Sequence, residues 1–269
     1  AQVDAVTLGD DGPRLDDADQ PLELKPLVKD VNALLERAHR AYLQLEGFNA
    51  DVAHELRNPL ATLIGSSELA LQRTRPADEL RDVIGGNLED LRRLAGIVND
   101  MLFLSRADRG EPARRRLVPS LAGELAEILD FHEAALQERD LRVMCIGDAD
   151  GAYDIPLVRR AVSNLIGNAS RYAATATTIV VRIETGDGRV RIGIENRGPT
   201  IAPKHLPRLF DRFYRVESSR GHARASRQYG LGLAIVAAIA RMHGGRVFAT
   251  SAGGHTSIGI DLPERPPEP

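Results

Sequence analysis

Apolar residues recur at helical spacing through the first part of the chain. Between residues 25 and 72 they follow steps of three, four or seven, a repeat near 3.5 that predicts one long helix with a coiled-coil seam. Such a helix would be roughly 70 Å long at about 1.5 Å per residue. The seam comprises Val31, Leu35, Ala38, Tyr42, Leu45, Val52, Leu56 and Leu63.

A second apolar stripe runs from residue 80 to 104, after a short loop at 72–80. Two long helices with a short connection predict an antiparallel hairpin. One hairpin buries its stripe poorly, whereas two hairpins from separate chains form a four-helix bundle. We therefore expect a homodimer.

The pattern changes after the polar, basic stretch at 106–116, which we interpret as a linker. The following residues alternate between helical and strand periodicity. GDG (186–188) lies between two strand-like runs and predicts a β-hairpin. The fold class is therefore multidomain, α and α+β, with a helical hairpin followed by a layered sandwich. Helices are expected near 120–138, 157–173 and 231–245, and strands near 141–147, 177–184, 188–196, 246–251 and 257–262.

The composition of the chain argues against several classes of function. The chain has 269 residues, 43% hydrophobic and 27% charged, with a net charge of −3. This charge gives no global attraction to nucleic acid. Cys145 is the only cysteine, so neither a disulfide framework nor a cysteine metal site is available. No apolar run is long enough to span a bilayer, and the first residue is Ala1, so we expect a piece of a longer, processed chain.

Polar chemistry is concentrated in HELRNPL (54–60). At about 100° per residue, His54 lies roughly 160° from Val52 and thus points away from the seam, with Asn58 on the same side one turn later. A carboxylate such as Glu55 could hold the imidazole with one nitrogen unprotonated. Pro59 predicts a local bend. The phase disfavours a core histidine, while a solvated surface histidine stays an alternative.

Two stretches resemble well-known motifs but lack a residue that each motif requires. HELRN lacks the second histidine of the zinc-protease HExxH motif, and GLGLAI (230–235) lacks the third glycine of GxGxxG. No GxxxxGK[ST] phosphate loop occurs. A nucleotide would therefore have to bind by another route.

Five stretches in order resemble the boxes of the two-component sensor histidine kinases. HELRNPL is similar to the phosphoacceptor box and SNLIGNASRYA (163–173) to the N box. ENRGPTI (195–201) resembles the first glycine box, LPRLFDRFYRV (206–216) the F box and YGLGLAIV (229–236) the second glycine box. The resemblance covers about residues 25–263 and implies a dimerisation hairpin followed by a Bergerat (GHKL) α/β sandwich that binds ATP.

The resemblance implies a role for each matching residue. His54 would be phosphorylated, Glu55 would activate it, and Asn58 would position water or assist transfer. ATP and Mg²⁺ would be the cofactors, with Asn168 as the direct metal ligand and Asn164 as its partner; amide oxygens suit Mg²⁺. The implied ATP-binding residues are Asn164, Asn168, Arg171, Tyr172, Asn196, Gly198, Tyr214, Arg215, Gly230, Leu231 and Gly232.

The partners and location follow from the same resemblance. We expect a response-regulator receiver domain as the second partner beside the homodimer, no nucleic acid, and membrane attachment only through a missing N-terminal segment. The chain would be the cytoplasmic portion of a bacterial inner-membrane sensor. The expected boundaries are a flexible segment at 1–24, the dimerisation and phosphotransfer hairpin at 25–107, a linker at 108–116, the ATP-binding domain at 117–263 and a disordered tail at 264–269.

The basic stretch at 197–229 has two interpretations. Its lysine and arginines could form a nucleic-acid patch or a lid over ATP, and the glycine-rich flanks favour the lid. The residues are Lys204, Arg208, Arg212, Arg215, Arg220, Arg224 and Arg227.

Three positions depart from the family pattern. Asn196 replaces the usual aspartate that accepts a hydrogen bond from the adenine amino group, and a neutral amide makes a weaker bond. Thr200 and Gln228 replace glycines. Strand alternation directs Glu195 to the opposite face, so it cannot substitute for the missing aspartate. Two alternatives to a kinase stay open: a phosphatase-dominant protein and a non-catalytic dimeric nucleotide-binding scaffold.

Overall fold

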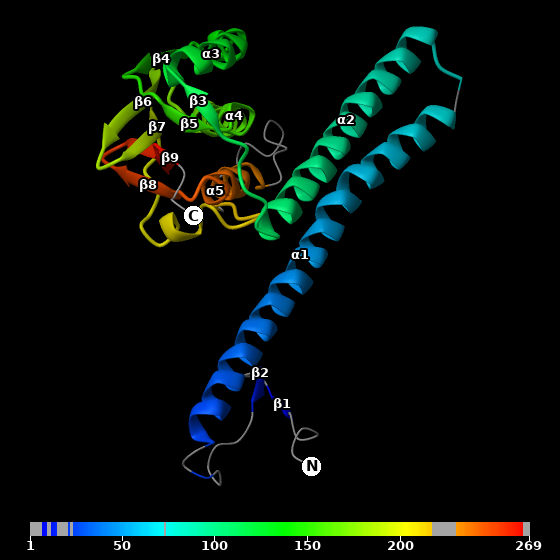
Figure 1. Cartoon of the computed structure of the whole chain (residues 1–269). Helices are drawn as coiled ribbons and strands as arrows, with labels where there is room; N and C mark the ends of the chain where they lie inside the picture. The colour runs from blue at the N-terminus through cyan, green and yellow to red at the C-terminus, as the bar shows by residue number, and fades with distance from the viewer. Residues whose placement is uncertain are drawn as a thin grey trace. The chain divides into compact units, whose positions relative to one another are not determined.

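The computed structural model describes residues 7–9, 12–14, 21, 24–72, 74–216 and 230–265, without the side chains of residues 7–9, 12–14, 40–55 and 58. The chain divides into two compact units, Ala1–Asp90 and Leu91–Pro269. Figure 1 traces the elements along the chain. Among the described residues, no helix is both long and apolar enough to cross a bilayer.

Two helices form the predicted hairpin. Helix α1 spans Lys25–Leu71 and continues through Pro59, and α2 spans Ala77–Asp108 with acidic residues in its first turn, where the helix dipole favours them. Near the connection, Ser66 Oγ donates to Asn87 Oδ1 (2.5 Å), and Asn87 Nδ2 donates to Ser67 Oγ (3.0 Å). These bonds join the two helices directly.

Two short strands precede α1. They are β1 (Thr7–Gly9) and β2 (Gly12–Arg14), which pair antiparallel. The sequence analysis expected no strands in the segment 1–24.

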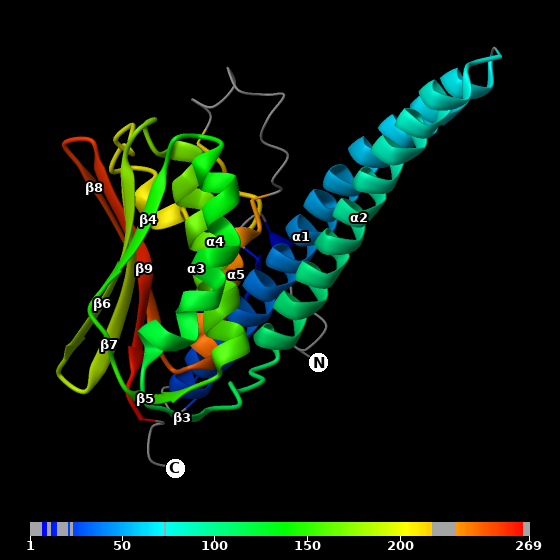
Figure 2. The same ribbon diagram turned by 90° about the horizontal axis from the view of Figure 1, so that it is seen from above.

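The second unit is a two-layer sandwich. Its mixed sheet has the order β4-β6-β7-β9-β8, in which only β4 and β6 run parallel. The sheet forms one layer and α3, α4 and α5 form the other (Figure 2). The strands are β4 (Arg142–Ile146), β6 (Thr178–Gly186), β7 (Arg189–Arg197), β8 (Arg246–Ala252) and β9 (His255–Pro263), and the helices are α3 (Leu121–Gln137), α4 (Ile155–Tyr172) and α5 (Gly232–Met242).

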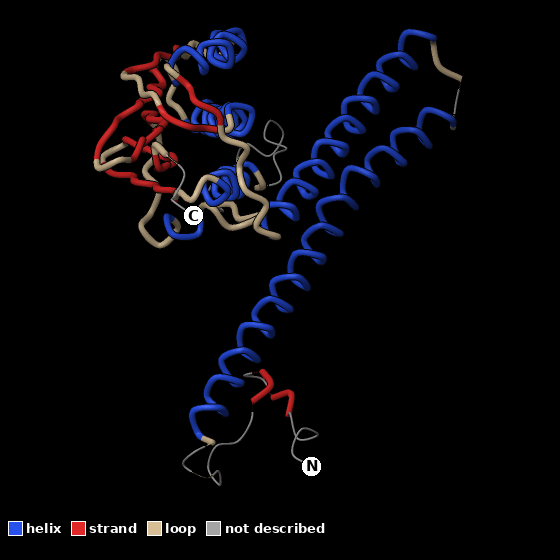
Figure 3. Tube along the Cα trace, in the orientation of Figure 1, coloured by secondary structure: helices blue, strands red, loops and turns tan. Residues whose placement is uncertain are grey.

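Two smaller elements complete the unit. Strands β3 (Arg116–Val118) and β5 (Gly151–Tyr153) pair antiparallel, and a 3-10 turn occupies Leu206–Arg208. Helices, strands and loops are distinguished by colour in Figure 3. The observed fold confirms the predicted hairpin followed by an α/β sandwich, although β3 and β5 were not predicted.

Strand alternation decides which side chains enter the core between the layers. On β7, Val190, Ile192 and Ile194 are at most 2% exposed, whereas Glu195 lies on the other face of the sheet. There the Glu195 carboxylate accepts a hydrogen bond from Arg182 Nε (2.8 Å), which lowers the pKa of Glu195. The predicted orientation of Glu195 is therefore confirmed.

Helices α3 and α4 each begin with a side-chain cap. Ser120 Oγ accepts from the Gly123 N–H (3.0 Å), and Asp154 Oδ1 accepts from the Leu157 N–H (3.3 Å). Such caps satisfy backbone donors that the helix leaves unpaired and are worth about 1 kcal/mol each. The Asp154 cap fixes where α4 starts and thus helps to set the position of the polar face of α4.

Candidate functional site

A cavity of about 510 Å³ opens in the second unit, between α4, the end of β7, the segment 199–216 and the start of α5. Its lining combines polar, cationic and apolar groups, with no aspartate or glutamate among the described residues. It therefore suits a ligand that has a flat apolar part and a strongly anionic part. The lining comprises Asn164, Asn168, Arg171, Tyr172, Asn196, Pro199, Thr200, Ile201, Ala202, Lys204, His205, Leu209, Tyr214, Arg215, Val216, Gly230, Gly232, Leu233, Thr256 and Ile258.

Helix α4 supplies one wall of the cavity. Asn164, Asn168, Arg171 and Tyr172 lie at helical spacings of four, three and one, so they share one side of the helix. Asn164 Nδ2 donates to the Arg160 carbonyl (3.0 Å), which leaves the Asn164 amide oxygen available. The wall thus offers amide oxygens followed by a cation and an aromatic ring.

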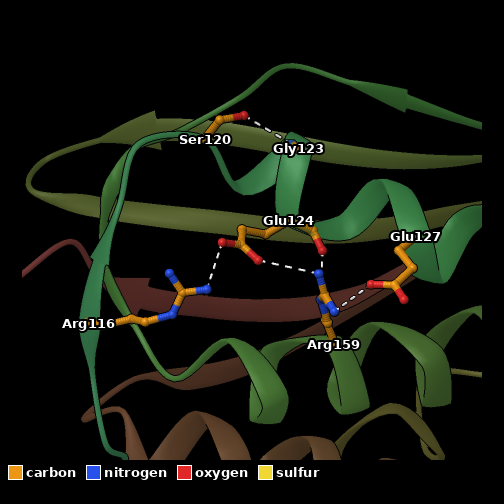
Figure 4. A network of polar contacts seen from close by, with 6 residues as sticks. All are labelled: Arg116, Ser120, Gly123, Glu124, Glu127 and Arg159. Atoms are coloured by element: carbon orange, nitrogen blue, oxygen red, sulfur yellow. Dashed lines mark hydrogen bonds and ion pairs between the residues drawn. The ribbon is translucent and has the colours of Figure 1, made fainter.

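A polar network fixes α4 against α3 (Figure 4). Arg159 of α4 donates through Nε to the Glu124 carbonyl (2.8 Å) and through Nη1 to the Glu127 carboxylate (2.8 Å). Glu124 also accepts from Arg116 Nη2 (2.7 Å), which connects β3 to the pair. The network lies on the side of α4 that faces α3 and so supports the helix that carries the asparagines.

A histidine–serine pair adds a second link between the same helices. His132 Nε2 lies 2.8 Å from Ser163 Oγ. Burial lowers the pKa of His132, so its neutral form is favoured at this contact.

Strands β7 and β9 supply buried polar residues to the cavity lining. Asn196 is only 8% exposed and pairs in register with Thr256, which is 6% exposed. Thr256 Oγ1 lies 2.8 Å from Ser251 Oγ. Within the described part of the chain, no hydrogen bond is formed by the Asn196 amide. This buried amide is therefore available to a ligand.

Two glycines allow close backbone approaches at the cavity. A Cβ added to Gly198 would lie 2.1 Å from the Tyr172 carbonyl oxygen, and one added to Gly230 would lie 2.8 Å from Phe213 backbone atoms. Gly230 also has a φ of +70°, a conformation that side chains disfavour. Both positions therefore require glycine.

The segment 199–216 contributes positive charge and an aromatic ring. The Tyr214 hydroxyl forms a hydrogen bond with His205 Nδ1 (2.6 Å). The Arg208 guanidinium lies 4.4 Å from the centre of the Tyr214 ring. Lys204 and Arg215 line the cavity beside them. Together with Arg171 they give the cavity a cationic lining.

Helix α5 begins at the cavity with Gly232 and has no side-chain cap. Its first backbone N–H groups are free of intrahelical partners, and the helix dipole adds partial positive charge there. The opposite end of α5 is fixed by His243, which is fully buried: Nδ1 donates to the Ile239 carbonyl (2.8 Å) and Nε2 accepts from the Asp154 N–H (3.1 Å). Burial lowers the pKa of His243, so the neutral ring joins α5 to the start of α4.

The structure brings together most of the residues that the sequence analysis assigned to ATP. Gly198 and Leu231 do not line the cavity but adjoin it, and Leu231 is buried. The side chains of His54, Glu55 and Asn58, and the segment 217–229 with Gln228, lie outside the described residues. The remaining predicted residues line the cavity: Asn164, Asn168, Arg171, Tyr172, Asn196, Tyr214, Arg215, Gly230 and Gly232.

Sequence reasoning missed several lining residues. Lys204 was assigned only to the basic stretch, and neither His205, Thr256 nor Ile258 was considered. The alternation of β9 could have placed Thr256 and Ile258 on the inward face, but their pairing with β7 was needed to bring Thr256 next to Asn196.

The chain matches two known domain families and a group of curated relatives. Residues 44–110 match the His Kinase A (phospho-acceptor) domain, and residues 153–266 match the histidine kinase-, DNA gyrase B- and HSP90-like ATPase. The sensor histidine kinase CusS of Escherichia coli (strain K12) is 43% identical over 263 residues, 97% of this chain and 54% of CusS. The chain belongs to the two-component sensor histidine kinases. It spans about half the length of the curated relatives it matches.

Two solved structures share the fold. The Acinetobacter baumannii histidine kinase AdeS has a TM-score of 0.65 at 22% identity, covering 78% of this chain and 98% of AdeS. The histidine kinase ThkA, crystallised in complex with the response regulator protein TrrA, has a TM-score of 0.66 at 20% identity, covering 93% of this chain and 70% of ThkA. At these identities the likeness concerns the fold of a histidine kinase.

Proposed function

We propose that this histidine kinase phosphorylates itself on His54 from ATP–Mg²⁺ and transfers the phosphoryl group to an aspartate of a response-regulator receiver domain. The proposal rests mainly on the cavity of about 510 Å³. Asparagine amides, cationic side chains and the start of α5, which has no side-chain cap, all lie around this cavity. The matched phosphoacceptor domain at 44–110 includes His54.

The chain's own groups fit a magnesium–triphosphate. Asn168 would be the direct Mg²⁺ ligand and Asn164, whose amide oxygen is left available by its bond to Arg160, its partner. Bound Mg²⁺ would neutralise phosphate charge in the transition state. Arg171 and Arg215 would contact phosphate oxygens, as would the N–H groups at the start of α5 near Gly230, Leu231 and Gly232.

The nucleoside would lie in the part of the cavity lined by β7 and β9. Tyr172 and Tyr214 present aromatic surface to it, and Asn196 presents the buried amide. Gly198 would let the chain pass close to Tyr172 without obstructing the base.

His54 would attack the γ-phosphorus through an unprotonated imidazole nitrogen. The P–N bond forms as the P–O bond to ADP breaks, and ADP leaves with the bonding electron pair. Glu55 would orient and activate the imidazole, and Asn58 would position water for dephosphorylating the partner.

Self-labelling with γ-labelled ATP and Mg²⁺ tests the proposal. His54→Ala should remove the label, whereas His39→Ala, which changes a histidine elsewhere on α1, should leave it. The label should be lost in acid, because phosphohistidine is acid-labile. Acid-stable label, or label that survives in His54→Ala, would contradict the proposal.

The homodimer is part of the same proposal. Large apolar side chains remain exposed on both hairpin helices, among them Ile64 (57%) on α1 and Ile84 (64%) on α2. Exposed apolar stripes of this kind are stabilised by a second hairpin in a four-helix bundle. The domain boundaries and the location at a bacterial inner membrane stay predictions.

A phosphatase-dominant protein is a second candidate, favoured by the neutral Asn196 where the family has a carboxylate. Slow self-labelling, combined with rapid dephosphorylation of a phosphorylated receiver domain that depends on Asn58, would favour it over the kinase.

A further inference from the structure

We infer that the part of the cavity lined by Asn196 accepts guanine as well as adenine, so that GTP binds in the cavity as well as ATP. The inference rests on the proposed function, because it concerns the base that the same cavity selects. The observation behind it is Asn196, a cavity-lining amide that is 8% exposed and forms no hydrogen bond within the described part of the chain.

The two purines present opposite hydrogen-bonding edges. Adenine offers a donor at its 6-amino group and an acceptor at N1, whereas guanine offers an acceptor at O6 and a donor at N1–H. An asparagine has one accepting oxygen and one donating NH₂ group, so a half-turn of the Asn196 amide matches either edge with two bonds. A carboxylate only accepts, so a carboxylate that lies opposite the six-position of the purine binds the adenine amino group and repels guanine O6.

Among the described residues, no hydrogen bond holds the Asn196 amide in one of its two orientations. Amide orientation is set by hydrogen bonds to neighbouring groups. The polar neighbour across the strands is Thr256, whose hydroxyl lies 2.8 Å from Ser251 Oγ, and a hydroxyl rotates to donate or accept. The Thr256 and Ser251 hydroxyls therefore do not favour one orientation of the Asn196 amide over the other.

No carboxylate among the described lining residues restores selectivity for adenine. Glu195 points to the other face of the sheet, where Arg182 binds it with two hydrogen bonds (2.8 and 3.0 Å). Ile201 and Ile258, which line the same cavity, are apolar and read no donor–acceptor pattern. Among the described lining residues of β7 and β9, the side chains that can pair with the base edge are the Asn196 amide and the Thr256 hydroxyl, and each can donate or accept.

Displacement of a fluorescent ATP analogue by ATP, GTP, ITP and CTP, with Mg²⁺ present, tests the inference. We expect GTP and ITP to displace the analogue at concentrations within about tenfold of ATP, because each forms the same number of bonds to Asn196. CTP, which lacks the purine edge, serves as the control and should displace it poorly. ITP lacks the guanine 2-amino group, so displacement by ITP alone would overturn the claim for GTP.

Asn196→Asp provides the matched variant. It should weaken GTP and ITP relative to ATP by about tenfold or more, because an acceptor would then face O6. An unchanged GTP-to-ATP ratio in the variant would overturn the role of Asn196. Should the variant fail to fold, the wild-type series still decides the matter.

The outcomes distinguish failure of the GTP inference from failure of the proposed function. Wild-type protein that binds ATP but requires more than about a hundredfold higher GTP overturns the inference and leaves the proposed function standing. Wild-type protein that binds no nucleotide at all overturns both.

Discussion

Gly198 is the position where one methyl group should do the most damage to the nucleotide cavity. The Cβ of Gly198→Ala would lie 2.1 Å from the Tyr172 carbonyl oxygen and 3.3 Å from Asn196 Nδ2. The nearest atom belongs to the backbone, so no side-chain rotation relieves the clash. The chain at 198 and the end of α4 must move apart.

The size of the movement follows from the geometry. Real Cβ atoms essentially never approach within 3.0 Å of another atom, so the two segments must separate by about 0.9 Å. Overpacking of this kind costs roughly 1–3 kcal/mol, which corresponds to a melting temperature lower by roughly 2–12 °C for a domain of this size. Because Tyr172 and Asn196 both line the cavity, we also expect ATP affinity to fall by about tenfold or more.

Gly186→Ala is the matched control. A Cβ there would meet no atom of the described residues within 4 Å, and Gly186 has no positive φ. Calorimetric melting and titration with ATP–Mg²⁺ should show a loss for Gly198→Ala and little change for Gly186→Ala. Equal melting temperatures and ATP affinities for Gly198→Ala and wild type would show that the clash at residue 198 has no effect.

Two further predictions concern pH and assembly. The pKa of His243 is lowered by burial, and that of His132 likewise, so below about pH 6.5 the unfolded chain binds protons that the folded chain does not. The free energy of unfolding should therefore fall as pH drops from 7.5 to 5.5 in urea titrations, and less steeply for His243→Gln; a profile equally steep in that variant would contradict the assignment. Ile84→Glu should convert the dimer to monomers in analytical ultracentrifugation, because it places a charge in the exposed apolar stripe, while Glu89→Ala should leave the dimer intact. A dimeric Ile84→Glu protein would argue against the bundle.

Elements with a long, regular pattern were predictable from the sequence. The hairpin helices and the β6–β7 hairpin follow their periodicities, and strand alternation alone is enough to place Asn196 inward and Glu195 outward. In these cases the local pattern and the tertiary environment agree.

The remainder depends on contacts between distant segments. Strands β3 and β5 have three residues each, too few for a periodic signal. The parallel pairing of β4 with β6 and the placement of Thr256 beside Asn196 arise from sheet order, which no local pattern encodes. His205 lines the cavity next to Tyr214, to which it is bonded, a contact between side chains nine positions apart in an irregular segment.

Self-phosphorylation on His54 can be examined by identifying the residue that carries the phosphoryl group. Wild-type protein should be incubated with ATP–Mg²⁺, digested at neutral or alkaline pH and sequenced by tandem mass spectrometry. We predict phosphate on the His54 side chain, within the peptide that contains HELRNPL. Phosphate found only on a serine, threonine or other histidine, or no phosphate in a sample shown to bind ATP, would contradict it.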